Sequence, residues 1–316
     1  MTTAETDTTT GGQAGVDGTD GAHGTDGTDG TEGPDGTEGP DGGEGPHVAE
    51  GPDAAEGPDV AEGPAAAPAP VKSAVRTVLL LEHFAARPGL HSLADIQNDL
   101  SLPKSSLYML LRTLVNLGWV ETDATGTRYG IGVRALLVGS SYIDGDEVVA
   151  AARPTLDRLS GDTTETIHLA RLDGTSVVYL ATRPSQHYLR PFTRVGRRLP
   201  VHSTALGKAL LATHTDEEVR RLLPRRLEAV TQHTITDREQ LMAELALVRE
   251  QGYAVDREEN TLGLRCFGVA VPYRTPARDA VSCSVPVARL TAGHEQMIKA
   301  ALFEARDRLS VVTRRM

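Results

Sequence analysis

One stretch of this sequence carries side chains that could bind nucleic acid. Pro103 suits the first position of a helix, and the leucines from Leu107 to Leu114 recur at the spacing of one buried helical stripe. On and beside the side that faces away from this stripe, the helix would carry polar, basic and larger side chains: Lys104, Ser105, Ser106, Tyr108, Met109 and Arg112. Hydroxyl, ammonium and guanidinium groups can donate hydrogen bonds to phosphates and base edges. The pattern therefore predicts a helix that enters the major groove of DNA.

A second stretch, His202–Leu211, could bind an anion. It runs from extended chain into a predicted helix, with Ser203 or Thr204 as the N-cap residue. The backbone amides of the first helical turn would be free to bind a carboxylate. These amides belong to Ala205, Leu206 and Gly207. An ordinary capped helix that packs through its small residues accounts for the same pattern, and from the residues alone it is the simpler interpretation.

An enzyme is the rival class of function, and the sequence gives it little support. Cys266 or Ser203 could act as a nucleophile with a histidine, but no assembled triad or metal signature accompanies them. The two cysteines, Cys266 and Cys283, have neither zinc nor disulfide spacing, and Cys266 is expected to be a buried small side chain. Metal-ligand spacing is also absent among the histidines considered: His168, His187 and His202. We therefore expect no catalysis, no metal and no cofactor.

The elements that would position the Pro103 helix form a predicted winged helix-turn-helix. A first helix is predicted over Val71–Arg87, and a short second helix follows the N-cap residue Ser92. A β-hairpin follows over 119–131, with Tyr129 and Ile131 facing inward. The tip of this wing would lie along a minor groove or the phosphate backbone through Thr125, Thr127 and Arg128. Because helix-turn-helix spacing is a moderate signal, a protein-docking module and a purely structural unit stay open as alternatives.

The charge of this region limits how it could bind DNA. Residues 71–134 hold seven basic and five acidic residues. That balance excludes a strong non-specific polycation, but it suits a dimer whose few contacts are doubled by symmetry.

The second half of the chain is predicted to be a sensory domain behind a linker helix. The linker, Val133–Tyr142, is amphipathic and could pair with its copy, and Asp144–Asp146 interrupts it before Val148–Leu159 resumes helical character. Asp173-Gly174 is a strong hairpin signal. Strands are predicted over 166–172, 176–183, 188–193, 253–256, 266–272 and 280–286, and helices near 205–213, 216–223, 237–251 and 291–311. Strands mixed with helices at both ends favour an α+β domain with an antiparallel sheet.

The first seventy residues differ in composition from the rest of the 316-residue chain. They contain 16 acidic residues, no Lys or Arg, 17 Gly and 8 Pro, whereas residues 71–316 carry a formal charge of about +5. Gly recurs every third position from Gly15 to Gly45, as in a collagen triple helix. The repeat is short and almost every triplet is acidic, so three such strands would repel one another. We predict a disordered acidic tail, because little in it can be buried.

Several protein classes are excluded. No run of 18 apolar residues exists, so no membrane span is expected. The N-terminus has no basic segment followed by an apolar one, as a secretory signal requires. With two cysteines in addition, a reducing cytoplasmic location is expected.

The chain from Ser73 to about Arg308 resembles the IclR-type (isocitrate lyase regulator) family of transcriptional regulators. The resemblance is carried by several ordered motifs: Leu102–Leu107, the Arg128–Gly132 end of the wing, Val195–Pro200, His202–Ala209 and Asp256–Cys266. It implies a winged-helix DNA-binding domain, a linker helix that helps dimerisation and a GAF-like effector-binding domain. One departure is Met109, where the family often has Arg, so base recognition at that point is expected to be apolar, for example against a thymine methyl group.

The resemblance also implies site residues and partners. The family's effector pocket corresponds here to Ala205 and Leu206 with Asp256, Cys266, Ser282 and Ser284. Amides and serine hydroxyls can bind a carboxylate while Asp256 accepts from ligand hydroxyls, which suits a small sugar, keto or hydroxy acid. The alternative that Asp256 and the Glu258-Glu259 pair are solvated turn carboxylates stays open. The partners implied are double-stranded palindromic operator DNA, a small carboxylate effector and further copies of the chain in a homodimer or homotetramer.

Together these observations predict a ligand-responsive DNA-binding repressor of catabolic genes. A transcriptional activator of the same class is the alternative, and an enzyme using the C-terminal domain is the less favoured one. The predicted organisation is a tail over 1–70, a winged helix-turn-helix over 71–132, a linker over 133–147 and an effector-binding domain over 148–316.

Overall fold

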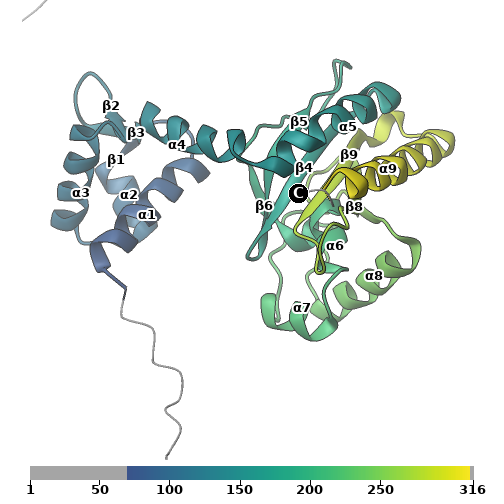
Figure 1. Ribbon diagram of the computed structural model, residues 1–316. Helices are drawn as coiled ribbons and strands as arrows, with labels where there is room; N and C mark the ends of the chain where they lie inside the picture. Colours follow the sequence, from purple (N-terminus) through teal and green to yellow (C-terminus); the bar gives the residue numbers. More distant parts are fainter. Residues whose placement is uncertain (1–69, 314–316) are drawn as a thin grey trace, which may run out of the picture. The chain divides into compact units, whose positions relative to one another are not determined.

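In this computed structural model, residues 70–313 are described, and they form an N-terminal region of short helices with a small sheet and a C-terminal region built on a larger sheet (Figure 1). The tail predicted over residues 1–70 lies outside the described residues, apart from Pro70. The elements of the first region are α1 (Lys72–Ala86), β1 (His91–Ser92), α2 (Leu93–Leu100), α3 (Lys104–Asn116), β2 (Val120–Thr122) and β3 (Arg128–Ile131). The winged helix-turn-helix architecture predicted from the sequence is confirmed.

Local sequence signals fix the helices of this region. The Ser92 hydroxyl accepts a hydrogen bond from the Asp95 amide at 3.2 Å, and the Asp95 carboxylate accepts from the Ser92 amide at 3.0 Å. This capping box starts α2 as predicted. Ser101 adopts a left-handed conformation that ends α2 and directs the chain into Pro103. The leucine stripe of α3 then packs into the core with Leu80, Phe84 and Ile96 of α1 and α2.

The wing differs from the prediction at one residue. Strands β1, β3 and β2 form an antiparallel sheet in that order, and Tyr129 is buried as expected. Ile131, which was expected to face inward, is instead 38% exposed. A Cβ atom at Gly130 would lie 2.9 Å from the Leu90 side chain, so the covered position beside Tyr129 is the glycine. The strand β1, which follows Leu90, was not predicted because two residues give no periodic pattern.

Two helices follow the wing, α4 (Val133–Asp144) and α5 (Glu147–Thr163). Helix α4 has no buried residue. The Asp146 carboxylate accepts a hydrogen bond from the Val149 amide at 3.0 Å, so a new helix begins there. The predicted interruption at Asp144–Asp146 is therefore confirmed. The domain boundaries predicted after residues 70, 132 and 147 stay predictions.

The C-terminal region contains a six-stranded sheet in which every neighbouring pair is antiparallel. The strand order is β6-β5-β4-β9-β8-β7. The strands are β4 (Thr166–Asp173), β5 (Ser176–Arg183), β6 (Arg198–Pro200), β7 (Ala254–Arg257), β8 (Leu264–Ala270) and β9 (Asp279–Pro286). The helices are α6 (Ala205–Leu211), α7 (Asp216–Leu222), α8 (Arg238–Gln251) and α9 (Ala292–Thr313). The predicted α+β class with an antiparallel sheet is confirmed.

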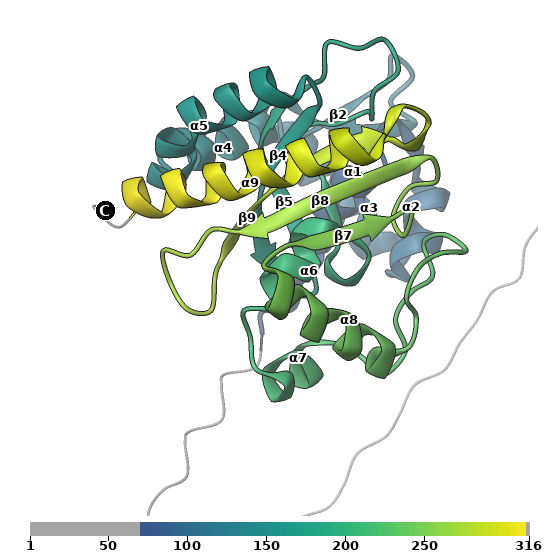
Figure 2. The ribbon, with the colours of Figure 1, turned by 90° about the vertical axis from the view of Figure 1, so that its right-hand side faces the viewer.

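The two faces of the sheet are covered by different helices. Helices α5 and α9 lie side by side over one face, and α6, α7 and α8 lie on the other (Figure 2). Side chains alternate between the faces: on β9, Val281, Cys283 and Val285 belong to the cluster under α5 and α9. Ser282 and Ser284 must therefore point to the face that carries α6. No helix within residues 70–313 combines the length and the apolarity that a membrane crossing requires.

The strand predicted over 188–193 is wrong. This segment is irregular, and its apolar side chains Tyr188, Leu189 and Phe192 are 106%, 61% and 81% exposed. The place beside β5 is taken by β6, in which Arg198 pairs with Val178 and Pro200 with Ser176. An apolar run predicts a strand only where a partner strand is present, and the sequence pattern does not show the partner.

Candidate effector pocket and DNA-binding surface

A pocket lies on the face of the sheet that carries α6, and the strand register explains its floor. Directly paired residues on antiparallel strands share a face. One row across four strands contains Asp256, Cys266, Ser284 and Thr166, each paired with the next. The adjacent row contains Gly268, Ser282, His168 and Thr182. The register therefore places residues of five strands, most of them polar, on one surface.

Gly268 allows the first turn of α6 to lie on this floor. A Cβ atom at position 268 would be 2.8 Å from the carbonyl carbon and oxygen of Ala205 and 3.1 Å from the Leu206 nitrogen. Only glycine permits so close an approach of two backbones. Ala205 and Leu206 accordingly line the pocket, directly above the sheet.

The structure brings six of the seven predicted effector-site residues together. Ala205, Leu206, Asp256, Cys266, Ser282 and Ser284 all line the pocket. Gly207 does not line it: its amide donates to the Thr204 side chain at 3.0 Å, and a Cβ atom there would lie 1.9 Å from the Val201 carbonyl oxygen. Gly207 therefore serves helix capping and packing. The cavity volume of the pocket is about 30 Å³, enough for only a few water molecules, so it must widen to hold a larger molecule.

Asp256 is buried, and its protonation is unusual for a carboxylate. Its Oδ1 accepts hydrogen bonds from the amides of Glu259 at 2.7 Å and Asn260 at 3.4 Å. Burial, followed by the nearby Glu259 carboxylate, raises the pKa of Asp256 to about 7. Asp256 can therefore act as a donor or as an acceptor near neutral pH. The alternative interpretation of Asp256 as a solvated turn carboxylate is contradicted by its 3% exposure.

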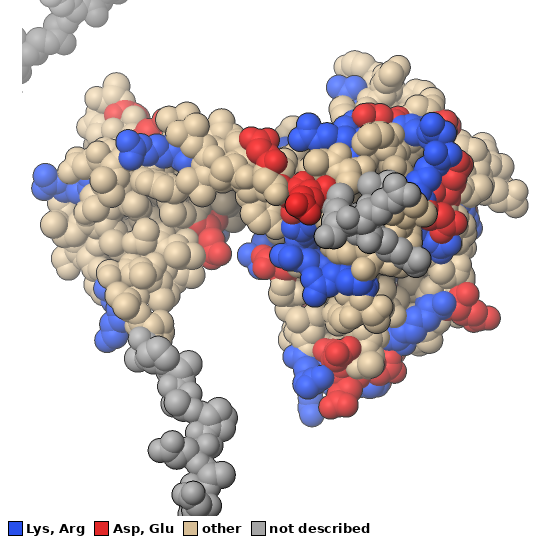
Figure 3. Space-filling view, in the orientation of Figure 1, with Lys and Arg blue, Asp and Glu red and all other residues tan. Residues whose placement is uncertain are grey.

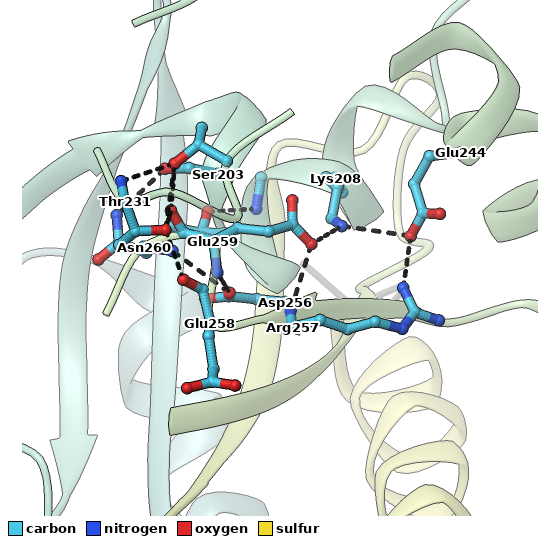
Figure 4. A network of polar contacts seen from close by, with 12 residues as sticks. Ser203, Lys208, Thr231, Glu244, Asp256, Arg257, Glu258, Glu259 and Asn260 are labelled. Carbon is cyan, nitrogen blue, oxygen red and sulfur yellow. Dashed lines mark hydrogen bonds and ion pairs between the residues drawn. The ribbon is translucent and has the colours of Figure 1, made fainter. Parts of the chain in front are cut away.

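An ion-pair network holds the loop that follows Asp256. Figure 4 shows Lys208 of α6 between two carboxylates. The Lys208 Nζ atom lies 2.6 Å from Glu259 Oε1 and 3.2 Å from Glu244 Oε1, and the lysine side chain is fully buried. The Asn260 side chain donates to the Ser203 hydroxyl at 3.1 Å. These contacts fix the segment after β7 against α6, and with it one wall of the pocket.

The pocket has no features of a nucleophilic or metal site. Burial raises the pKa of the Cys266 thiol well above its usual value, so the thiol stays protonated at neutral pH. Within residues 70–313, no group of three or more His, Cys, Asp or Glu side chains is arranged to hold a metal ion.

Sequence reasoning missed several residues that line the pocket. They are His168, Tyr179, Pro191, Phe192, Arg197, Leu199, Thr204, Asn260, Thr261 and Leu264. His168 is buried and stacks on Tyr179, with ring centroids 4.4 Å apart. In β4 the polar His168 stands between the apolar residues Ile167 and Leu169, so the sequence indicates that it faces the other side of the strand. That pattern does not show that Ser282 lies opposite His168.

The predicted DNA-binding residues on α3 form an exposed surface backed by the leucine stripe. Tyr108 and Met109 are 43% and 59% exposed, and the Arg112 guanidinium carbon lies 5.8 Å from the centre of the Tyr108 ring. Lys104 and Ser105 are exposed as well. Ser106 is half-buried, and its hydroxyl accepts a hydrogen bond from Arg76 at 2.8 Å. The structure thus brings these residues together, with Ser106 partly engaged by α1.

The predicted wing-tip residues are held by an acidic side chain. Asp123 Oδ1 accepts from the amides of Thr127 at 2.9 Å and Arg128 at 3.0 Å, and Oδ2 accepts from the Thr125 hydroxyl at 2.7 Å. The side chains of Thr127 and Arg128 remain exposed. The hydrogen bonds explain the tight turn, and they leave Arg128 as the basic group of the tip.

A further exposed surface is apolar. On α4, Val133, Leu136, Leu137, Val138 and Tyr142 are each half or more exposed. The face of the α1–α4 region shown in Figure 3 carries few charged side chains. Apolar surface of this kind marks an interaction site in soluble proteins.

Comparisons with known proteins agree with this architecture. The family model of the IclR helix-turn-helix domain matches residues 73–124, and that of the bacterial transcriptional regulator IclR C-terminal domain matches residues 140–311. The HTH-type transcriptional regulator KdgR of Dickeya chrysanthemi is 35% identical over 220 residues, which is 69% of this chain and 72% of that protein. The transcriptional repressor IclR of Escherichia coli is 34% identical over 226 residues, 70% of this chain and 82% of that protein.

A solved structure shows the same fold. The crystal structure of an IclR transcriptional regulator from Alicyclobacillus acidocaldarius has a TM-score of 0.68 and 26% identity, and the match covers 78% of this chain and all of that one. The helix-turn-helix region and the region that contains the large sheet and its pocket thus lie at the residues that the two family models match. The chain belongs to the IclR family of DNA-binding transcriptional regulators, and it is a regulator rather than an enzyme.

Proposed function

We propose that this chain is a repressor of a catabolic operon that binds a palindromic operator as a dimer or tetramer and responds to a small carboxylic acid. The observation that carries the proposal is the exposed face of α3, with Lys104, Tyr108, Met109 and Arg112 backed by a buried leucine stripe. Such a face can enter a major groove while Arg and Lys contact phosphates or guanine. Several relatives carry names that support repression, among them the acetate operon repressor of Salmonella typhimurium.

The apolar surface of α4 supports assembly with a second copy. Leu136 and Leu137 are 67% and 66% exposed, although each would gain free energy by burial. Two copies joined through α4 would present two α3 helices, and the two half-sites of a palindrome would match that two-fold symmetry. Doubling the contacts also compensates for the weak positive charge of the DNA-binding region.

The pocket supports a small acid as the effector. Its donors are the Ser282 and Ser284 hydroxyls, the amides at the start of α6 and, when it is protonated, the Asp256 carboxyl group. These groups can bind a carboxylate without a metal. When it is ionised, Asp256 can accept from a hydroxyl of the same ligand.

The test is a mobility-shift experiment on the DNA upstream of the protein's own gene, repeated in rising salt and with a panel of small carboxylic acids. We expect the wild-type chain to bind one segment specifically and a cognate acid to weaken binding. Arg112→Ala is expected to abolish specific binding, while Arg221→Ala, an exposed arginine on α7, leaves it unchanged. Unaltered specific binding by Arg112→Ala would contradict the proposal. Reporter transcription that falls when the gene is deleted would indicate an activator instead.

A further inference from the structure

The end of the pocket at β4 and β5 contains a buried histidine with one polar atom unused. His168 is 2% exposed. Its Nδ1 atom lies 3.2 Å from the Thr182 hydroxyl and 3.3 Å from the Thr193 hydroxyl. Its other nitrogen, Nε2, has no hydrogen-bond partner among residues 70–313 and is not sealed from the pocket. A polar atom that is reached from the pocket and has no protein partner is free to form a hydrogen bond with a ligand or with water.

The His168 ring is neutral, and its free nitrogen can hydrogen-bond. Burial, and secondly the charge of Arg197, lowers the pKa of His168 to about 3, so the ring is neutral at pH 7. The Thr182 hydroxyl donates to the Ile167 carbonyl at 3.3 Å, and both Thr182 and Thr193 hydroxyls can either donate to or accept from Nδ1. A neutral ring carries one N–H and one lone pair, so Nε2 donates when Nδ1 accepts and accepts when Nδ1 donates. His168 therefore offers the pocket a neutral ring nitrogen that can hydrogen-bond to a ligand.

Arg197 adds a positive charge at the same end. The Arg197 carbonyl accepts a hydrogen bond from the Tyr179 amide at 2.9 Å, which holds the Arg197 backbone against β5, and Arg197 lines the pocket together with Tyr179 and His168. The guanidinium group donates to the Phe192 carbonyl at 2.9 Å and has further N–H groups without a partner in the described residues. A neutral ring nitrogen that can hydrogen-bond and a cation that both line the pocket suit a ligand oxygen, above all a hydroxyl, which can both donate and accept.

The distance across the floor fixes the size of a ligand that uses both ends. Asp256 lies on β7 and His168 on β4, with β8 and β9 between them. Three strand spacings of about 4.8 Å, with an offset of two residues or about 6.8 Å along the strand, separate their backbones by roughly 16 Å. A ligand that contacts both ends must therefore extend across most of the floor. An extended chain of about six carbons or a para-substituted ring reaches much further across it than pyruvate does. The wall at Phe192 can give way for it, because little burial of this 81%-exposed side chain opposes movement.

We propose that His168 and Arg197 form a second polar subsite for an oxygen at the far end of the effector, so that the effector is a two-ended acid rather than an acid of two or three carbons. The inference rests on the proposed function, since it takes the pocket to be the effector site. His168 is then a specificity-determining residue. It selects between acids that share the same carboxylate end.

The test uses matched acids that differ only at the far end. Calorimetric titration of the full chain compares 2-oxoadipate with 2-oxohexanoate, 4-hydroxybenzoate with 4-methylbenzoate, and both pairs with pyruvate. We expect at least one acid with a far-end oxygen to bind tenfold or more tighter than its methyl counterpart and than pyruvate. His168→Phe, which keeps a stacking ring, is expected to remove that preference while binding of the methyl acid changes less than twofold.

Two controls separate a role in recognition from a role in folding. His168→Gln keeps a side chain that can hydrogen-bond and is expected to restore part of the preference. His187→Phe replaces an exposed histidine that does not line the pocket and is expected to change nothing. A wild-type chain that shows no preference in either pair, or a preference that survives His168→Phe, overturns this inference while operator binding leaves the regulator in place. Failure to bind operator DNA would contradict the proposed function instead.

Discussion

Arg171 and Asp279 face each other across β4 and β9 and form a bidentate ion pair in the interior. The Arg171 Nε atom donates to Asp279 Oδ1 at 2.7 Å and Nη2 donates to Oδ2 at 3.0 Å. Nη1 of the same guanidinium donates to the Tyr142 hydroxyl at 2.8 Å and to the Asp146 carboxylate. Three residues along the same strands, His168 faces Ser282 in the pocket. The strands of the pocket floor are therefore tied to the start of α5.

Removal of this arginine is expected to be costly. Arg171→Met would leave two carboxylates, Asp279 at 0% and Asp146 at 10% side-chain exposure, without their counter-ion. Loss of one partner of a buried ion pair typically destabilises by about 3–5 kcal/mol. We expect a loss of that size in the free energy of unfolding, measured by urea denaturation at pH 7.

The matched control is Arg198→Met. Arg198 pairs with Asp173 at 3.3 Å, but both side chains are more than half exposed, so the expected loss is below about 1 kcal/mol. Equal losses in the two variants would show that burial of the Arg171 cluster does not matter.

The local part of the fold could be predicted because neighbouring residues determine it. The stripe from Leu107 to Leu114, the Ser92 cap and the Asp173-Gly174 turn each give a signal within a few residues, and the structure has α3, α2 and the β4–β5 hairpin at those places. Strand order has no such signal. Strands β4 and β9 pair although Arg171 and Asp279 are 108 residues apart. For the same reason the apolar run at 188–193 was mistaken for a strand.

The candidate pocket, too, could be predicted only in part. The gathering of Asp256, Cys266, Ser282 and Ser284 was expected from the family resemblance, whereas no local pattern placed His168 or Arg197 beside them. Lys208 followed a glycine in a helical stretch, and nothing nearby in sequence indicated its partners Glu244 and Glu259. The role of a residue whose partner is distant in the sequence can be predicted only when the order and register of the strands are known.

Gly268 provides a steric test of the pocket. In Gly268→Ala the new Cβ atom would meet the Ala205 backbone at 2.8 Å, so α6 must shift away from the sheet. Overpacking of this kind costs about 1–3 kcal/mol. We expect a lower thermal midpoint and at least a tenfold loss of affinity for the effector acid.

Gly161→Ala is the control for the loss of glycine itself. A Cβ atom at this position of α5 meets nothing within 4 Å, and Ala stabilises a helix by up to about 1 kcal/mol relative to Gly. Its thermal midpoint should rise or stay constant. A midpoint for Gly268→Ala that matches the wild type would contradict the close approach of α6.

Asp256 should make stability depend on pH in an unusual direction. Because its pKa is raised to about 7 in the folded chain, the folded protein keeps a proton that the unfolded chain releases near pH 4. Between about pH 4 and pH 7 this residue therefore lowers the free energy of unfolding as pH rises, and above about pH 7 its effect is constant. Asp256→Asn keeps the Oδ1 acceptor and removes the titration.

The measurement is the difference in unfolding free energy between Asp256→Asn and the wild type at pH 5 and at pH 8. We expect the variant to be relatively more stable at pH 8. Comparison at each pH cancels the other titrating groups, which both proteins share. A difference that is the same at the two pH values would show that Asp256 ionises at its ordinary pKa.

The acidic tail, residues 1–70, gives a prediction from charge alone. Its 16 acidic residues are joined to a body of about +5, so they should compete with DNA for the basic side chains. Deletion of residues 1–70 is expected to raise the affinity for non-specific DNA at about 0.05 M salt and to steepen the response to salt, with little difference left at about 0.3 M because salt screens the charges. Fluorescence anisotropy with a random duplex measures both the affinity and its salt dependence.

The control is a tail of equal length with Asn and Gln in place of Asp and Glu. It should behave like the deletion, since the charge of the tail and not its bulk is responsible. If the chain with this neutral tail instead binds DNA like the wild type, competition by charge is ruled out.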